Sequence, residues 1–112
     1  MSKKVLFAYQ WITNGDMSQA EIQSAYTSIA YLDNISVQVK WTGTSPVGVL
    51  RIVGSVNGED FVVQPISAPP VNANSGNVMI SFQNAGYQKV GLLYQRTSGS
   101  GTMNSWIGGK EV

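Results

Sequence analysis

Apolar and polar residues alternate along most of this chain. In NISVQVKWT, residues 34–42, every second side chain is apolar: Ile35, Val37, Val39 and Trp41. A period of two places alternate side chains on opposite faces of an extended backbone, so this segment predicts a strand with one face in a core. Further strand-like segments follow at residues 47–56, 59–65, 78–83, 88–97 and 101–110.

The alternation also predicts how the side chains divide between faces. In residues 47–56, Leu50 and Ile52 point inward and Arg51 points outward. Later segments each present one such face, formed by Val78, Ile80 and Phe82, by Val90, Leu92 and Tyr94, and by Met103, Ser105 and Ile107. We expect aromatic residues to supply much of the core, notably Trp11, Trp41, Phe61 and Phe82.

Glycine marks two predicted turns. Asn57 and Gly58 lie between two strand-like segments and tolerate the positive φ values of a hairpin turn. TSGSG, residues 97–101, could be a linker, a phosphate-binding loop or a hairpin turn. A phosphate-binding loop opens a helix, whereas the residues after Gly101 alternate as in a strand, and a linker would need more folded chain beyond it. We therefore expect a hairpin turn between strands at 89–97 and 102–110.

Two N-terminal segments each allow two interpretations. Residues 1–15 form either an edge strand of this chain, which we take as the default, or an arm that pairs with a neighbouring subunit. Residues 18–31 contain Tyr, Thr and Ile, which favour a strand, although one helical turn could begin behind Asp16 or Ser18. We interpret this segment as a strand, because nothing elsewhere in the chain indicates a helical layer.

Six to eight short strands joined by turn residues predict the fold class. Gly, Pro, Asn and Ser separate the strand-like segments, and no internal repeat or linker divides the sequence. This arrangement is typical of an all-β protein with an antiparallel sheet folded into a sandwich or jelly roll. We therefore predict one antiparallel β-sandwich, jelly-roll-like domain over residues 1–112.

The composition argues against an enzyme. The chain has no His and no Cys, which removes the commonest general base, the commonest metal ligand and thiolate chemistry. Of its acids, Glu59 and Asp60 are adjacent, so on a strand they would point to opposite faces rather than together across a cleft. We predict no catalytic residues, no metal site and no cofactor.

Charge and hydropathy narrow the range of partners. Charged residues make up 12% of the chain, about half the usual share, which suggests a surface that is covered in an assembly. The net charge is +1 and the basic residues are scattered, so we expect no nucleic-acid partner. No apolar run has the length of a membrane span or a signal peptide, so we expect no membrane partner and synthesis in a cytoplasm.

Aromatic and apolar residues outside the predicted core form a candidate interface. Tyr and Trp are enriched where subunits meet, and exposed aromatic rings can also stack on sugars. The candidates lie in the N-terminal segment and near predicted strand ends or outward faces, and comprise Val5, Leu6, Phe7, Tyr9, Trp11, Tyr26, Tyr31, Tyr87 and Trp106. We expect them to contact a protein partner, with a glycan as the alternative.

Two segments resemble small virion proteins of tailed bacteriophages. One is LDNISVQVKWTGTSPVGVLRIVGSVNGEDF, residues 32–61, and the other is AGYQKVGLLYQRTSGSGTMNSWIGGKEV, residues 85–112. The shared outline is a strand ending in Trp-Thr-Gly, a GS-x-(D/N)-G hairpin, and Y-x-R-x-SG-x-G-T before a closing strand with Gly-Lys. The piece GSVNGEDF is also similar to discoidin-type sandwich modules, with Phe61 where those have Trp.

The resemblance implies a non-enzymatic structural protein mounted on a phage particle. Such small proteins include capsid decoration (cement) proteins and tail-associated modules. The size of this chain and its lack of a fibre-like repeat favour decoration of the head. The implied partners are the major capsid protein or other virion proteins, together with further copies of this chain in a homo-oligomer. The implied location is the virion, after synthesis in the cytoplasm of a bacterial host. The alternative is a tail- or fibre-associated module that binds a glycan or an adaptor.

Overall fold

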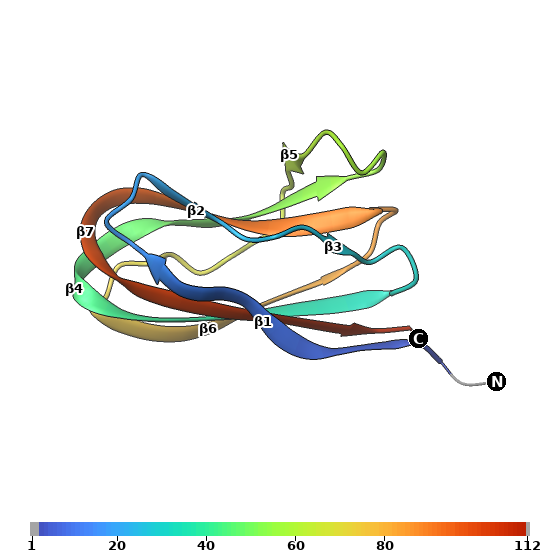
Figure 1. The fold of residues 1–112 in the computed structure, drawn as a ribbon, viewed down its shortest axis with the longest axis horizontal. Helices are drawn as coiled ribbons and strands as arrows, with labels where there is room; N and C mark the ends of the chain where they lie inside the picture. The colour runs from blue at the N-terminus through green and yellow to red at the C-terminus, as the bar shows by residue number, and fades with distance from the viewer. Residues whose placement is uncertain (1–2, 112) are drawn as a thin grey trace.

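The computed structural model describes residues 3–111, which contain seven strands and no helix (Figure 1). Two of the strands are long and the others are short. The strands are β1 (Val5–Asp16), β2 (Glu21–Gln23), β3 (Thr27–Ser28), β4 (Asn34–Ser55), β5 (Val62–Val63), β6 (Ser75–Gln83) and β7 (Lys89–Lys110). All of their pairings are antiparallel.

A single long antiparallel pair of strands organises the molecule. β4 and β7, each 22 residues long, pair from Asn34 opposite Lys110 to Ser55 opposite Lys89. Halfway along, both strands bend together at the left of Figure 1, so that the strand pair folds onto itself and forms two layers. The first half of β4 and the second half of β7 form the first layer (lower in Figure 1), and the remaining halves form the second layer.

The shorter strands complete both layers in the order of a jelly roll. In the first layer β1 pairs with β7 and β6 pairs with β4. In the second layer β2 and β3 pair with β7, and β5 pairs with β4. The chain crosses between layers after β1, after β3, within β4, after β5, after β6 and within β7, which gives the two-layered order of a jelly-roll sandwich. The predicted all-β antiparallel sandwich is confirmed.

The core lies between the two layers and contains most of the side chains that the alternation placed inward. Phe82, predicted for the core, and Val78 are only half-buried and pack against its margin. Each layer turns one face of each long strand toward the other layer. Fully or almost fully buried are Ile35, Val37, Val39, Trp41, Leu50, Ile52, Ile80, Val90, Leu92, Tyr94, Met103, Ser105 and Ile107, whereas Arg51 is exposed. Trp11 is also buried, at 6% exposure, as predicted for the core.

The hairpin turn predicted at residues 97–101 is wrong. This segment belongs to one continuous strand, β7, which bends at TSGSG opposite the bend of β4, so the separation of residues 34–42 from 47–56 is wrong as well. Gly43 lies opposite Gly101, and no space exists there for a side chain, because a Cβ on Gly43 would overlap the carbonyl oxygen of Ser100. Gly99 has φ +81° and Ser45 has φ +47°. A bend between paired strands needs the same small residues and positive φ values as a turn.

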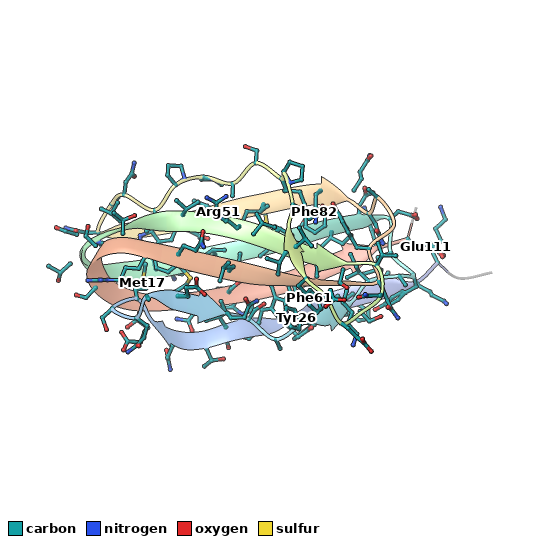
Figure 2. The ribbon with its side chains drawn as sticks, turned by 90° about the horizontal axis from the view of Figure 1, so that it is seen from above. Met17, Tyr26, Arg51, Phe61, Phe82 and Glu111 are labelled. Atoms are coloured by element: carbon teal, nitrogen blue, oxygen red, sulfur yellow. The ribbon has the colours of Figure 1, made fainter. Side chains whose placement is uncertain are left out.

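Four other expectations have clear outcomes. β2 and β3 confirm strand over helix for the segment around residues 18–31, and β1 pairs with β7 of its own chain, as the default interpretation predicted; residues 1–2 lie outside the described range. Gly58 has the expected positive φ, +80°, in the loop that joins β4 to β5. Phe61, predicted to lie in the core, instead lies outside it and stacks on Tyr26, with ring centroids 3.5 Å apart (Figure 2).

Candidate interaction surfaces

The N-terminal candidates lie on β1, which is an edge of the first layer. The pairing of β1 with β7 shifts register three times, and the first shift falls between Leu6 and Tyr9. Such irregularities turn side chains away from the sheet. Phe7, in that shift, is 83% exposed, and Val5 and Tyr9 are also exposed, whereas Leu6 is half-buried against the core and Trp11 is buried. Val5 lies opposite Lys110 on the outer face, whereas Tyr9 lies opposite the buried Ile107 and its hydroxyl shares a hydrogen bond with that of Thr27 on β3. The exposed edge around Phe7 is called the β1 patch below.

The other tyrosine candidates occupy separate positions. The exposed ring of Tyr26 lies above Gly91, whose Cα leaves room for it, and stacks on Phe61. Tyr31 is half-buried, with the Nζ atom of Lys4 5.8 Å from its ring centroid. Tyr87 is half-buried, and its hydroxyl donates a hydrogen bond to Oε1 of Gln64 at 3.1 Å. Each of these tyrosines therefore contacts another side chain of its own chain in addition to facing solvent.

Trp106 lies in the middle of the outer face of the first layer. It is half-buried, with Gln10 of β1 opposite it on one side and Gln38 of β4 on the other. The neighbouring positions along the face carry the small residues Ala8, Ser36 and Gly108, which leave a hollow of about 140 Å³ beside the indole. A second hollow of about 260 Å³ lies on the other side of Trp106 and includes Lys40 and Asn104 in its lining. We call these two hollows the Trp106 groove.

The polar side chains of the Trp106 groove are uncharged apart from Lys40. Its lining comprises Ala8, Gln10, Ser36, Gln38, Lys40, Trp41, Thr42, Met79, Thr102, Asn104, Trp106, Ile107 and Gly108. Two amide pairs are fixed by hydrogen bonds: Nε2 of Gln10 donates to Oδ1 of Asn104 at 2.9 Å, and Nε2 of Gln38 donates to Oδ1 of Asn77 at 2.8 Å. A half-exposed indole flanked by oriented amides and hydroxyls can stack on an apolar ring face and hydrogen-bond its hydroxyl groups.

Sequence reasoning placed Trp106 among the candidates but missed the rest of the groove. Gln10, Gln38 and Asn104 all fall on outward positions of their strands, which the alternation does give. Their proximity depends on the pairing of β1, β7 and β4, and the sequence does not reveal that order.

Two titratable side chains have pKa values that depart from the ordinary ones. Hydrogen bonds from the side chain and the backbone of Ser18 hold the pKa of Asp16 below its ordinary value, in an exposed turn. Burial raises the pKa of the Tyr94 hydroxyl, which lies in the core without a hydrogen-bond partner among the described residues. Within residues 3–111, no group of three or more His, Cys, Asp or Glu residues is placed to hold a metal ion.

Comparison with known proteins identifies the fold and no family. No family model matches the sequence, and no curated protein matches it. The prophage-derived protein YomS of SPBc2 is similar in structure, with a TM-score of 0.58 and 10% identity over 96% of each chain. A chain in the structure of infectious bursal disease virus Gx strain matches with a TM-score of 0.62 and 9% identity, over 97% of this chain and 32% of the viral one.

A third similar structure is the CBM22-1 xylan-binding domain of Xyn10C from Paenibacillus barcinonensis, with a TM-score of 0.51 and 9% identity over 98% of this chain and 95% of that domain. At such low identity these likenesses define a β-sandwich fold that phage-derived, viral and carbohydrate-binding proteins share. In the part of the chain that the structure describes, no helix is long and apolar enough to cross a membrane.

Proposed function

We propose that this protein is a non-enzymatic structural protein of a phage virion, and that it decorates the capsid by binding the assembled head. The observation that carries the proposal is the β1 patch, where Phe7 is 83% exposed on an irregular edge strand. The sequence resemblance to small tailed-phage virion proteins and the sandwich fold shared with a prophage-derived protein support it. The partner would be the major capsid protein or another virion protein, and the location would be the virion.

The β1 patch supplies the binding energy in this proposal. Complete burial of a Phe side chain contributes about 1.5–3 kcal/mol. Val5, also exposed on β1, adds further apolar area. A decoration protein that bridges neighbouring capsid subunits in many copies resists the internal pressure of packaged DNA, because many weak contacts must then break together.

Replacing Phe7 with serine is expected to weaken binding to the head by about 10- to 100-fold, because the burial energy of the ring is lost. The measurement is co-sedimentation of the purified protein with mature particles that lack it. Val62→Ser is the matched control, since Val62 is 62% exposed on β5, an edge strand of the other layer. The proposal fails if the wild-type protein does not bind particles, or if Phe7→Ser binds as well as Val62→Ser.

The Trp106 groove favours a second candidate function, binding of a neutral glycan by a tail- or fibre-associated module. Stacking of a sugar ring on Trp106 and hydrogen bonds to the fixed amides of Gln38 and Asn104 would provide recognition. One of the similar structures is a xylan-binding domain. Xylan is a polysaccharide with an uncharged backbone, and a groove with mostly uncharged polar side chains would suit a ligand of that class.

For this second function, Trp106→Ala is expected to reduce oligosaccharide affinity by at least about tenfold, through the loss of ring stacking. A glycan array followed by titration calorimetry measures it, and Phe7→Ser should retain full glycan affinity. An array without hits for the wild-type protein would exclude the glycan function and leave head binding untouched.

A further inference from the structure

The four edges of the sandwich differ in how they are protected against pairing with another chain. An edge strand exposes unpaired backbone groups, and natural proteins protect such edges with bulges, short strands, charges or proline. β1 has three register shifts, and the opposite layer ends in the very short strands β2, β3 and β5. These edges are protected in the ordinary ways.

β6 has no bulge, no proline and no charged residue along its length. It pairs with β4 over nine consecutive residues, from Ser75 to Gln83, without a register shift. The strand contains no proline, and no charged residue occurs anywhere between Asp60 and Lys89. Among the described residues, no backbone hydrogen bond joins β6 to a segment other than β4, so its outer edge is unpaired.

The polar side chains of β6 do not cover this edge. The Ser81 hydroxyl shares a hydrogen bond of 3.0 Å with that of Ser36, and Asn77 accepts one of 2.8 Å from Gln38. Both partners lie on β4, so these side chains are directed back across their own sheet. Met79, at the middle of the strand, is 55% exposed.

We propose that β6 pairs antiparallel with β6 of a second copy of this chain, about a two-fold axis beside Met79, so that the two first layers form one continuous sheet. Two-fold pairing places Met79 opposite Met79 of the partner subunit and Ser75 opposite Gln83 of the partner subunit. This register pairs all nine residues. It also sets outward residues against outward residues and inward against inward, whereas a one-residue slip would mix the faces.

The uncharged edge suits a second copy of this chain, because it removes the like-charge repulsion that would oppose pairing across a two-fold axis. Across a two-fold axis, a charged residue near the axis meets its own like charge, which destabilises the pair. β6 and the chain on both sides of it carry no charge. The exposed Met79 side chains contact each other at the centre and are removed from water. This pairing concerns two copies in solution and is independent of the proposed binding to a phage head.

Disulfide trapping tests the register. The chain has no Cys, so one introduced thiol reports on one position. Mild oxidation should convert Met79→Cys to a covalent dimer, because directly opposite strand residues have Cα atoms about 4.5–5.5 Å apart, within disulfide range. Ser81→Cys is the matched control. In the proposed register, the introduced cysteines at position 81 of the two subunits would be offset by four residues, about 13 Å along the strands, and should stay uncrosslinked. Equal crosslinking of both variants, or none in Met79→Cys, overturns the proposed pairing.

Charge placed at the axis tests the interface without crosslinking. We expect the wild-type protein to sediment as a dimer at micromolar concentration, and Met79→Lys to sediment as a monomer with unchanged circular dichroism, because Met79 is exposed in the single chain. Phe7→Lys adds the same charge to the opposite edge of the first layer and should remain a dimer. A wild-type monomer up to millimolar concentration, or a dimer of Met79→Lys, overturns the proposal.

Discussion

Replacing Gly99 with alanine is expected to lower the free energy of unfolding by about 3 kcal/mol or more. Gly99 has φ +81°, a conformation that strains any residue with a Cβ atom. A Cβ atom there would also overlap the carbonyl oxygen of Ser45 and lie 2.6 Å from the Cα atom of Pro46. Those atoms belong to the bend of β4, which is paired with β7 on both sides of the bend and cannot move independently.

Gly86→Ala is the matched control for Gly99→Ala. Gly86 also has a positive φ, +108°, but a Cβ atom there would meet nothing within 4 Å. Only the backbone strain then applies, and we expect a loss of about 1 kcal/mol. Urea denaturation of both variants gives the two free energies. If the two losses of free energy are equal, the close approach of Gly99 to Ser45 and Pro46 does not contribute to the stability of the bend.

The facing of side chains could be predicted from sequence because the period of two fixes it locally. Val37, Val39 and Ile107 are buried and Arg51 is exposed, as their positions in the alternation required. The bend was not predictable in the same way. Glycines and a residue at positive φ appear both in a turn that reverses a strand and in a bend that continues it. The deciding fact is that Gly101 meets Gly43, more than fifty positions away in sequence.

The candidate surfaces were predicted only as far as they depend on single residues. Phe7 was identified as an interface candidate because it lies in an apolar N-terminal segment, and the register shift in β1 accounts for its exposure. The Trp106 groove depends on three strands that lie far apart in sequence. Phe61 follows a turn at the end of β4, and its ring stacks on the ring of Tyr26 outside the core. Such long-range pairings leave no local pattern.

Replacing Trp41 with alanine is expected to lower the free energy of unfolding by about 3–5 kcal/mol. The indole is 3% exposed and covers Gly76 of β6, where a Cβ atom would overlap the ring. Its Nε1 donates a hydrogen bond of 2.9 Å to the carbonyl of Ala73, which ties the connection between β5 and β6 to the first layer. The substitution therefore removes core volume and the attachment of this connection together.

Trp41→Phe separates these two contributions. A phenyl ring retains much of the volume but cannot donate a hydrogen bond to the carbonyl of Ala73. We therefore expect Trp41→Phe to lower the free energy of unfolding by less than Trp41→Ala does, with about 1 kcal/mol of that loss due to the hydrogen bond. Chemical denaturation measures the total loss of free energy. Native-state hydrogen exchange measures the local effect at Val71 and Gly43, whose backbone amides form hydrogen bonds between β4 and the connection from β5 to β6. If Trp41→Ala costs less than about 1 kcal/mol, or if exchange at both amides is unchanged, the indole does not hold β6 and its connection in place. In that case the edge on which dimerisation is proposed would have to be stabilised by its pairing with β4 alone.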